Sequence, residues 1–271
     1  MFLVIAFSMP GADPSRPGQL FFDWGWRIPF LCSAVMVVIG LWVRLRLVEA
    51  PAFARAKAED RLVRVPVARV FRTHWRQLLL GTFAMLATYV VFYLVSSWTL
   101  SYGTGSPATG GLGYSYYSFV LLTIGGCVFF AVSTLLSGPL ADRFGRRPTL
   151  LVVQLAMIVF GGLFVPLLGG GLAGVIAYLV IGFLLMGLTF GPMAALLPEL
   201  FPTALRYTGS GIAYNVSSIL GAAVAPLVAT ALIVAAGGSP WLVGVYLSAM
   251  AAISFVALLL TRETKDAAIE E

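Results

Sequence analysis

The sequence predicts an all-α, polytopic membrane protein, and three observations lead to this fold class. First, 60% of the 271 residues are hydrophobic and 10% are charged, whereas a soluble domain carries about 25% charged residues. Second, the charge-free runs 77–141, 148–198 and 207–261 are each long enough for two crossings, since one crossing takes about 20 residues. Third, the runs are continuously apolar and do not alternate as barrel strands do, so the crossings are expected to be helices.

Glycine-rich breaks at 101–113, 167–174 and 235–240 divide the three long runs into helical hairpins. A shorter charge-free run, 28–43, adds a single crossing before them. We therefore expect a bundle of about seven helices, placed near 27–44, 77–99, 115–139, 148–167, 173–197, 208–235 and 241–261.

The basic residues predict the orientation of these helices. All but two of the 17 Lys and Arg residues fall in 44–76, in the short links near 139–147 and 198–207, or in the tail after 261. The three glycine-rich turns contain none. The positive-inside rule places the basic segments and the C-terminus in the cytoplasm, against an anionic inner leaflet. The net charge of +6 therefore points to a bacterial inner (plasma) membrane rather than to nucleic acid.

A charge cluster interrupts the apolar chain at 137–150, which reads SGPLADRFGRRPTL. This stretch resembles the signature loop that joins the second and third helices of each six-helix half in the major facilitator superfamily. The resemblance implies a conformational latch that stabilises one access state and grips the other half of the transporter. The latch residues would be Gly138, Asp142, Arg143, Gly145, Arg146 and Arg147.

Two further stretches resemble the metabolite/proton symporter branch of that family. They are WGWRIPFLCSAVMVVIGLWVRLRLVEAPAF at 24–53 and LPELFPTALRYTGSGIAYNVSSILGAA at 197–223, and RETK at 262–265 is a weaker echo. Together they cover nearly the whole chain from Asp23 onward. A complete member has twelve helices, so the resemblance implies that this chain holds the sixth to the twelfth. We expect an incomplete fragment whose N-terminal half is missing.

The resemblance also implies a domain organisation. We expect a stub and extracytoplasmic loop at 1–26, and the last helix of the missing half at 27–44. A basic central cytoplasmic loop follows at 45–76. The six-helix C-terminal half would then occupy 77–261, and a cytoplasmic tail 262–271.

Elementary chemistry gives the cluster two interpretations. Gly138 and Gly145 allow close helix approach and a tight turn. Asp142 can pair with Arg146 and face the N-terminus of the next helix, where a carboxylate is favoured. The arginines of the cluster can also bind anionic lipid, in which case the cluster is an anchor that any basic loop could replace.

Polar residues inside the spans are the candidates for a substrate cavity. Tyr89 and Tyr93 share one face of the 77–99 helix with other hydroxyl residues, and Asn215 is the one amide in 208–235. Buried hydroxyls and amides need partners, although helix packing is the competing explanation for such faces. Glu199 and Arg206 lie seven residues apart at an inner helix end and are candidates for a cytoplasmic gate or a structural pair.

No acid, Lys, Arg or His lies in the middle of a predicted span, so the site of a coupling proton is expected in the missing half. The sequence offers no paired intramembrane carboxylates, metal cluster, cofactor motif or nucleophile–base set, which disfavours an enzyme. The expected function is secondary transport of a small organic metabolite, an organic acid or an osmolyte, by alternating access and coupled to protons. The alternative is a non-transporting sensor or partner subunit derived from a transporter half.

Overall fold

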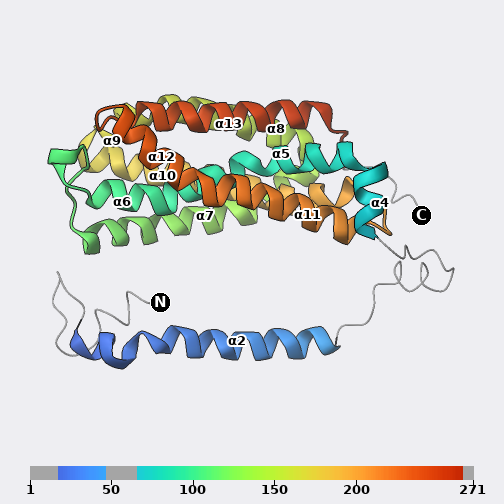
Figure 1. The fold of residues 1–271 in the computed structure, drawn as a ribbon, viewed down its shortest axis with the longest axis horizontal. Coiled ribbons are helices and arrows are strands. Elements are labelled where there is room, and N and C mark those ends of the chain that lie inside the picture. The colour runs from blue at the N-terminus through green and yellow to red at the C-terminus, as the bar shows by residue number, and fades with distance from the viewer. Residues whose placement is uncertain (1–17, 47–65, 265–271) are drawn as a thin grey trace.

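The computed structural model describes residues 18–46 and 66–264, and every regular element in these ranges is a helix (Figure 1). The all-α prediction is confirmed. The predicted stub up to residue 17, the central loop from 47 to 65 and the tail from 265 lie outside the described residues. The helices are η1 (Phe21–Gly25), α2 (Arg27–Arg46), α4 (Pro66–Thr73), α5 (Trp75–Tyr93), η2 (Leu94–Trp98), α6 (Thr99–Thr104), η3 (Pro107–Thr109), α7 (Tyr116–Phe144), α8 (Arg146–Gly162), α9 (Phe164–Leu168), α10 (Gly171–Glu199), α11 (Arg206–Ser218), η4 (Ile219–Ala223), α12 (Val224–Ala235) and α13 (Trp241–Leu260).

Six continuous helical stretches within the described residues are long and apolar enough to cross a membrane. Three of them join several elements: η1 with α2, α5 with η2 and α6, and α11 with η4 and α12. The crossing predicted at 148–167 is instead divided into α8 and α9 at Leu163. Pro166 explains the break, because it has no N–H to donate to the carbonyl of Gly162.

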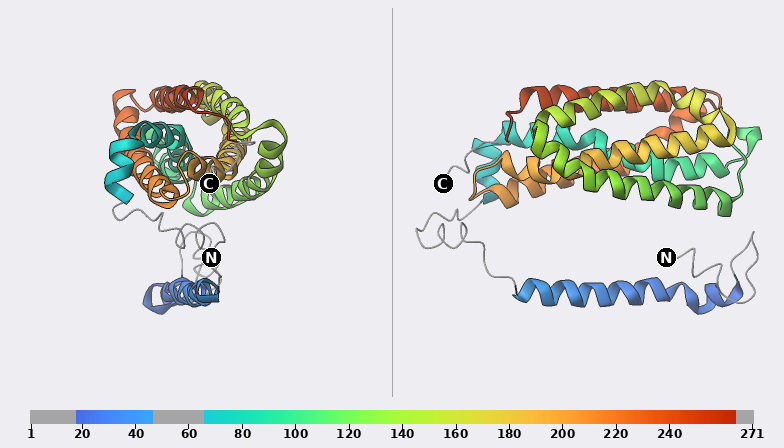
Figure 2. Two further views of the ribbon diagram at one scale, coloured as in Figure 1. Left: turned by 90° about the vertical axis from the view of Figure 1, so that its right-hand side faces the viewer. Right: turned by 180° about the vertical axis from the view of Figure 1, so that it is seen from behind.

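The helices from α5 to α13 run alongside one another as one bundle, whereas α2 lies apart from it (Figures 1 and 2). Within the bundle, α7 packs on α10, α13 packs on α8 and α5, and α11 packs on α5. Nearly all described side chains of α2 are exposed, as expected of a helix surrounded by lipid.

The most extensive helix contact in the bundle is between α7 and α10. A Cβ placed on Gly187 of α10 would collide with the Ser133 hydroxyl and would lie 2.5 Å from the Phe130 carbonyl oxygen of α7. Only a residue without a side chain allows the two backbones to approach this closely, which is how small residues hold membrane helices together.

The predicted boundaries are wrong at the charge cluster. The helix expected to end near 139 continues to Phe144, so Asp142 and Arg143 lie in the last turn of α7. The link that was expected to span 139–147 is reduced to Gly145, and α8 begins at Arg146. Pro139 does not end the helix, since membrane helices tolerate a proline whose missing hydrogen bond is compensated by neighbours.

Candidate functional site

The junction between α7 and α8 turns on one glycine. Gly145 has φ +98°, a conformation that residues with a side chain rarely adopt. A Cβ at this position would also lie 2.9 Å from Oε2 of Glu263. The tight turn expected at Gly145 is therefore present, and it leaves room for a carboxylate. We call this region, with Glu199 and Glu263, the charged junction.

Glu263 holds the N-terminus of α8. Its carboxylate accepts hydrogen bonds from the backbone N–H groups of Arg146 (3.1 Å) and Arg147 (3.0 Å). These N–H groups have no partner within the helix, and the helix dipole favours a negative charge there. The sequence predicted this role for Asp142, and that prediction is wrong: Asp142 is exposed in the last turn of α7.

Arg146 forms an ion pair with Glu199, through Nη1 and Oε2, that joins the start of α8 to the end of α10. The two side chains are 19% and 28% exposed. The expected pairing of Arg146 with Asp142 is therefore also wrong. Among the described residues, Glu199 pairs with Arg146 and not with Arg206. The Nε atom of Arg206 is buried and has no hydrogen-bond partner there. A gate formed by Glu199 and Arg206 stays a prediction.

Arg147 joins α8 to α13. Its Nε donates to the carbonyl of Leu258 (2.9 Å) and one Nη donates to that of Leu259 (2.7 Å). These carbonyls lie in the last turn of α13, where the helix dipole favours a cation. The Leu258 carbonyl also accepts from the hydroxyl of Thr261. Two of the three arginines of the cluster thus bind other helices of the same bundle.

The remaining latch residues contribute less to this network. A Cβ on Gly138 would meet nothing within 4 Å, so the close approach expected there is absent. The guanidinium of Arg143 lies 5.2 Å from the centre of the Phe144 ring, within the range of a cation–π interaction.

A cluster of aromatic rings lies deeper in the bundle. The ring of Tyr89, at the middle of the span Trp75–Thr104, packs edge-on against Tyr214 of α11 and Phe190 of α10, with centroid distances of 5.4 and 6.4 Å. Phe92 of α5 and Phe130 of α7 contact Phe190 in turn, at 6.2 and 5.9 Å. Rings from four spans therefore meet around Phe190.

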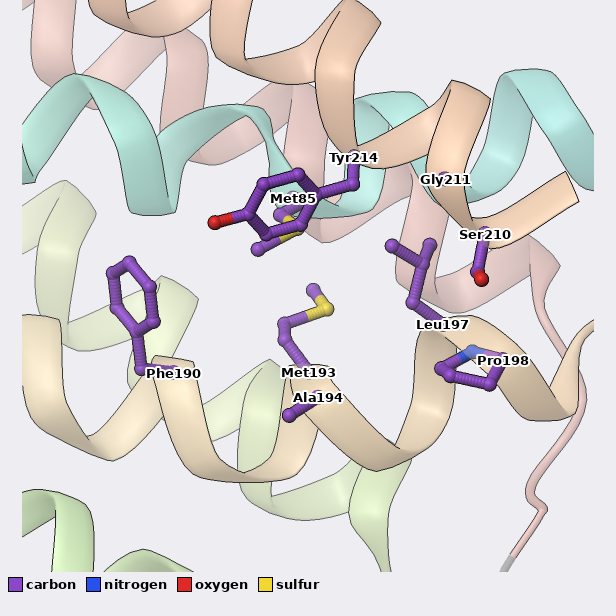
Figure 3. Close-up of a pocket in the computed structure, with 9 residues that line it drawn as sticks. All are labelled: Met85, Phe190, Met193, Ala194, Leu197, Pro198, Ser210, Gly211 and Tyr214. Carbon is purple, nitrogen blue, oxygen red and sulfur yellow. The ribbon is translucent and has the colours of Figure 1, made fainter. Parts of the chain in front are cut away.

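A cavity of about 360 Å³ adjoins this cluster on the side of the charged junction. In Figure 3, Phe190 lies at one end of it and Pro198 and Ser210 at the other, and Tyr214 faces Met193 between them. The cavity lies between α5, α10 and α11. Its full lining is Met85, Phe190, Met193, Ala194, Leu197, Pro198, Ser210, Gly211 and Tyr214. Among the described residues no charged side chain lines it, and the side-chain polar groups of the lining are the hydroxyls of Ser210 and Tyr214.

The backbone is irregular on both sides of Tyr89. Before it, the Ser254 hydroxyl of α13 accepts from the N–H of Ala87 (3.0 Å) and donates to the carbonyl of Phe83 (2.7 Å), so it is inserted into the hydrogen bonding of α5. After it, the π-helical turn η2 begins at Leu94. A second π-helical turn, η4, packs against α5. Such turns inside membrane helices are frequent at functional sites.

The predicted cavity residues have different surroundings. Tyr89 is 6% exposed and its hydroxyl has no hydrogen-bond partner among the described residues. Tyr93 is half-buried and its ring contacts Phe92. Asn215 is exposed and its amide donates to the Gly211 carbonyl (2.7 Å). None of the three predicted residues belongs to the cavity lining. The structure therefore brings Tyr89 and Tyr93 near one aromatic cluster and leaves Asn215 outside it.

Sequence reasoning missed Glu263, Phe190, Tyr214 and Ser210. Glu263 belongs to RETK, a weak echo of the family, and no spacing rule links it to a loop more than 110 residues earlier. Tyr214 neighbours the predicted Asn215, and a search for aromatic residues on the half of each span nearer the charged junction would have found it together with Phe190.

Comparison with known proteins gives consistent matches. The model of the Major Facilitator Superfamily matches residues 17–226. The inner membrane metabolite transport protein YhjE of Escherichia coli K12 is 45% identical over 249 residues, which are 91% of this chain and 56% of that protein. A putative metabolite transport protein of Haemophilus influenzae is 40% identical over 257 residues, 92% of this chain and 58% of its own length.

A more distant relative has a more specific name. The proline/betaine transporter of E. coli K12 is 30% identical over 256 residues, which are 91% of this chain and 50% of that transporter. The chain thus spans about half the length of the curated relatives it matches. No solved structure gave a significant match. With a family model that covers most of its length and an all-helical, membrane-spanning fold, the chain belongs to the Major Facilitator Superfamily.

Proposed function

We propose that this chain forms the C-terminal part of a secondary transporter that moves a small organic solute across the bacterial inner membrane by alternating access. The family membership and the metabolite transport proteins among its relatives support transport of small organic solutes. Coupling to protons, and cooperation with an N-terminal half, are parts of the same proposal.

The observation that carries the proposal is the neutral aromatic cavity beside irregular backbone. A transporter needs a site near the membrane midplane, lined by interrupted helices. Tyr89 lies at the middle of its span, between an interrupted stretch of α5 and a π-helical turn.

The lining favours an osmolyte over an organic acid. A dicarboxylate inside a membrane needs fixed cations to bind it. The membrane-spanning parts of α5, α10 and α11 fall in the charge-free runs 77–141, 148–198 and 207–261, so they supply none. Ring faces instead attract ammonium groups by cation–π interaction. A zwitterion with a cyclic or methylated ammonium group suits this site, and the proline/betaine transporters among the relatives support that class.

The charged junction is proposed to act as the conformational latch. Because Arg146 and Arg147 tie α8 to α10 and α13, the junction moves as one unit with its own bundle. The exposed Asp142 at the end of α7 is then the residue of the junction proposed to contact an N-terminal half. The excess of basic residues at this end supports a cytoplasmic location against an anionic leaflet.

Uptake into proteoliposomes tests the proposal. The chain is reconstituted alone, and also within a chimera in which it replaces the aligned 249 residues of the E. coli relative YhjE. An inward proton gradient should drive uptake of radiolabelled betaine or proline by the chimera, and a protonophore should abolish it. Uptake of a dicarboxylate in preference to both zwitterions would contradict the solute class. Binding of solute with no uptake in either arrangement would favour the non-transporting alternative.

A further inference from the structure

The short helix α4 has an apolar surface that the bundle does not cover. Successive residues of an α-helix are rotated by about 100°, so Val67 and Phe71 lie on one side and Arg69 and Arg72 on the opposite side. Val70, next to the apolar side, is fully buried against the bundle. Val67 and Phe71 remain 50% and 54% exposed.

The placement of α4 matches that of a helix in a membrane surface. Figures 1 and 2 show it crossing the end of the bundle, at the periphery and roughly perpendicular to the spans. It packs on α5 and α11. The charged residues of the bundle lie at this same end of these two helices. Trp75, which follows α4 directly, is 57% exposed, and tryptophan is enriched at the boundary between headgroups and hydrocarbon.

From this geometry we infer that α4 is an interfacial helix that binds anionic phospholipid. Val67, Phe71 and Trp75 insert below the headgroups, which removes their apolar surface from water. Arg69, Arg72 and Arg76, all exposed, bind the phosphates above them. Charge complementarity selects an anionic lipid as the occupant, because an arginine at such a surface contributes attraction to anionic headgroups.

This inference also reassigns the lipid contacts of the protein. Lipid binding was one of two interpretations of the arginines at 143–147, but Arg146 and Arg147 are engaged by Glu199 and by the end of α13. On α4, by contrast, Arg69 and Arg72 are exposed and flank the exposed side chains of Val67 and Phe71. The inference goes beyond the proposed transport function and does not depend on it, since lipid docking can be measured without any solute.

Site-directed spin labelling in lipid nanodiscs tests the geometry. Cys32 and Cys127 are first replaced by serine, and single labels are placed through Val67→Cys, Phe71→Cys, Arg69→Cys and Arg72→Cys. The exposed Leu135 of α7 provides a reference in the hydrocarbon through Leu135→Cys. Labels at 67 and 71 should be reached by oxygen and shielded from a polar nickel reagent, whereas labels at 69 and 72 should be reached by the nickel reagent.

Equal nickel access at all four positions would overturn the inference, because α4 would then lie in water. Shielding of 67 and 71 from both reagents would also overturn it, because protein rather than lipid would cover the apolar side.

The anionic preference is tested on the Phe71 label by replacing phosphatidylcholine with phosphatidylglycerol. The label should move deeper with phosphatidylglycerol, and R69Q/R72Q should remove that shift. R44Q/R262Q is the matched control, because it removes the same charge at two exposed arginines outside α4. This control should retain the shift in depth. Loss of the shift in both variants would show general attraction rather than a site on α4.

Discussion

The charged junction and the aromatic region of this bundle are held together by different forces. At the junction, Glu263, the Arg146–Glu199 pair and Arg147 join α8 to α10, α13 and the segment after it. Around Tyr89 no charged group takes part, and helices approach through a glycine contact, ring packing and a serine inserted into a neighbouring helix.

The difference follows from the depth of the two regions. A charge near the headgroups keeps access to water and costs little, whereas a charge at the centre of a bilayer is expensive. Packing and neutral hydrogen bonds are therefore the forces available at mid-depth, and the helices there can shift without breaking an ion pair. The comparison predicts that steric changes are most damaging at mid-depth, and that charge changes have intermediate effects at the junction.

The largest effect is expected for Gly187→Leu. The new side chain would overlap with Ser133 and the Phe130 backbone of α7, and overpacking against backbone costs about 3 kcal/mol or more. Fluorescence-detected size exclusion after heating should show loss of the folded chain. Gly125→Leu is the matched control, because nothing lies within 4 Å of its Cβ position. Equal stability of the two variants would contradict the proposed α7–α10 contact.

A smaller loss is expected for Arg146→Gln. It leaves the Glu199 carboxylate, 28% exposed, without its cation, which should cost about 2 kcal/mol, below the range for a fully buried pair. Glu199→Gln in the same chain should restore part of the stability. Unfolding in mixed detergent should give a coupling energy of about 1 kcal/mol in the double-mutant cycle. Additive effects would show that the two side chains do not stabilise each other.

Glu263→Ala should cost about 1 kcal/mol, because two N–H groups at the start of α8 lose their acceptor. Glu263→Gln keeps one acceptor oxygen and should cost less. The same unfolding assay measures both variants, with the exposed Arg262→Gln as control. If alanine and glutamine have equal effects, the carboxylate does not cap α8.

The smallest effect on stability is expected for Tyr89→Phe. The hydroxyl is buried without a partner among the described residues, so its removal should change the free energy of unfolding by less than about 0.5 kcal/mol. If the hydroxyl contacts the solute, uptake by the chimera should still fall by about tenfold, the effect of one lost hydrogen bond. A clear loss of stability would instead indicate that the hydroxyl has a structural partner.

Much of the fold could be predicted from the sequence, because lipid imposes strict rules on backbone hydrogen bonding and on charge. Charge-free runs and glycine-rich breaks placed the spans correctly to within a few residues, except that Pro166 divides one of them. The candidate site could be predicted only in part. Tyr89 and Tyr93 lie by the aromatic cluster, but periodicity along one helix could not place Phe190 or Tyr214 beside them, since these belong to other helices.

The sequence by itself determined the membrane class, the all-α fold, the approximate limits of most spans and the family resemblance at 137–150, because these depend on local composition and order. The tertiary structure alone decided which charges meet. Asp142 was the nearer candidate along the chain, yet Glu263 caps α8 and Glu199 pairs with Arg146. The physical reason is that the ends of α8, α10 and α13 converge at one face of the bundle, and partners for a helix end are chosen by distance in space rather than by separation in sequence.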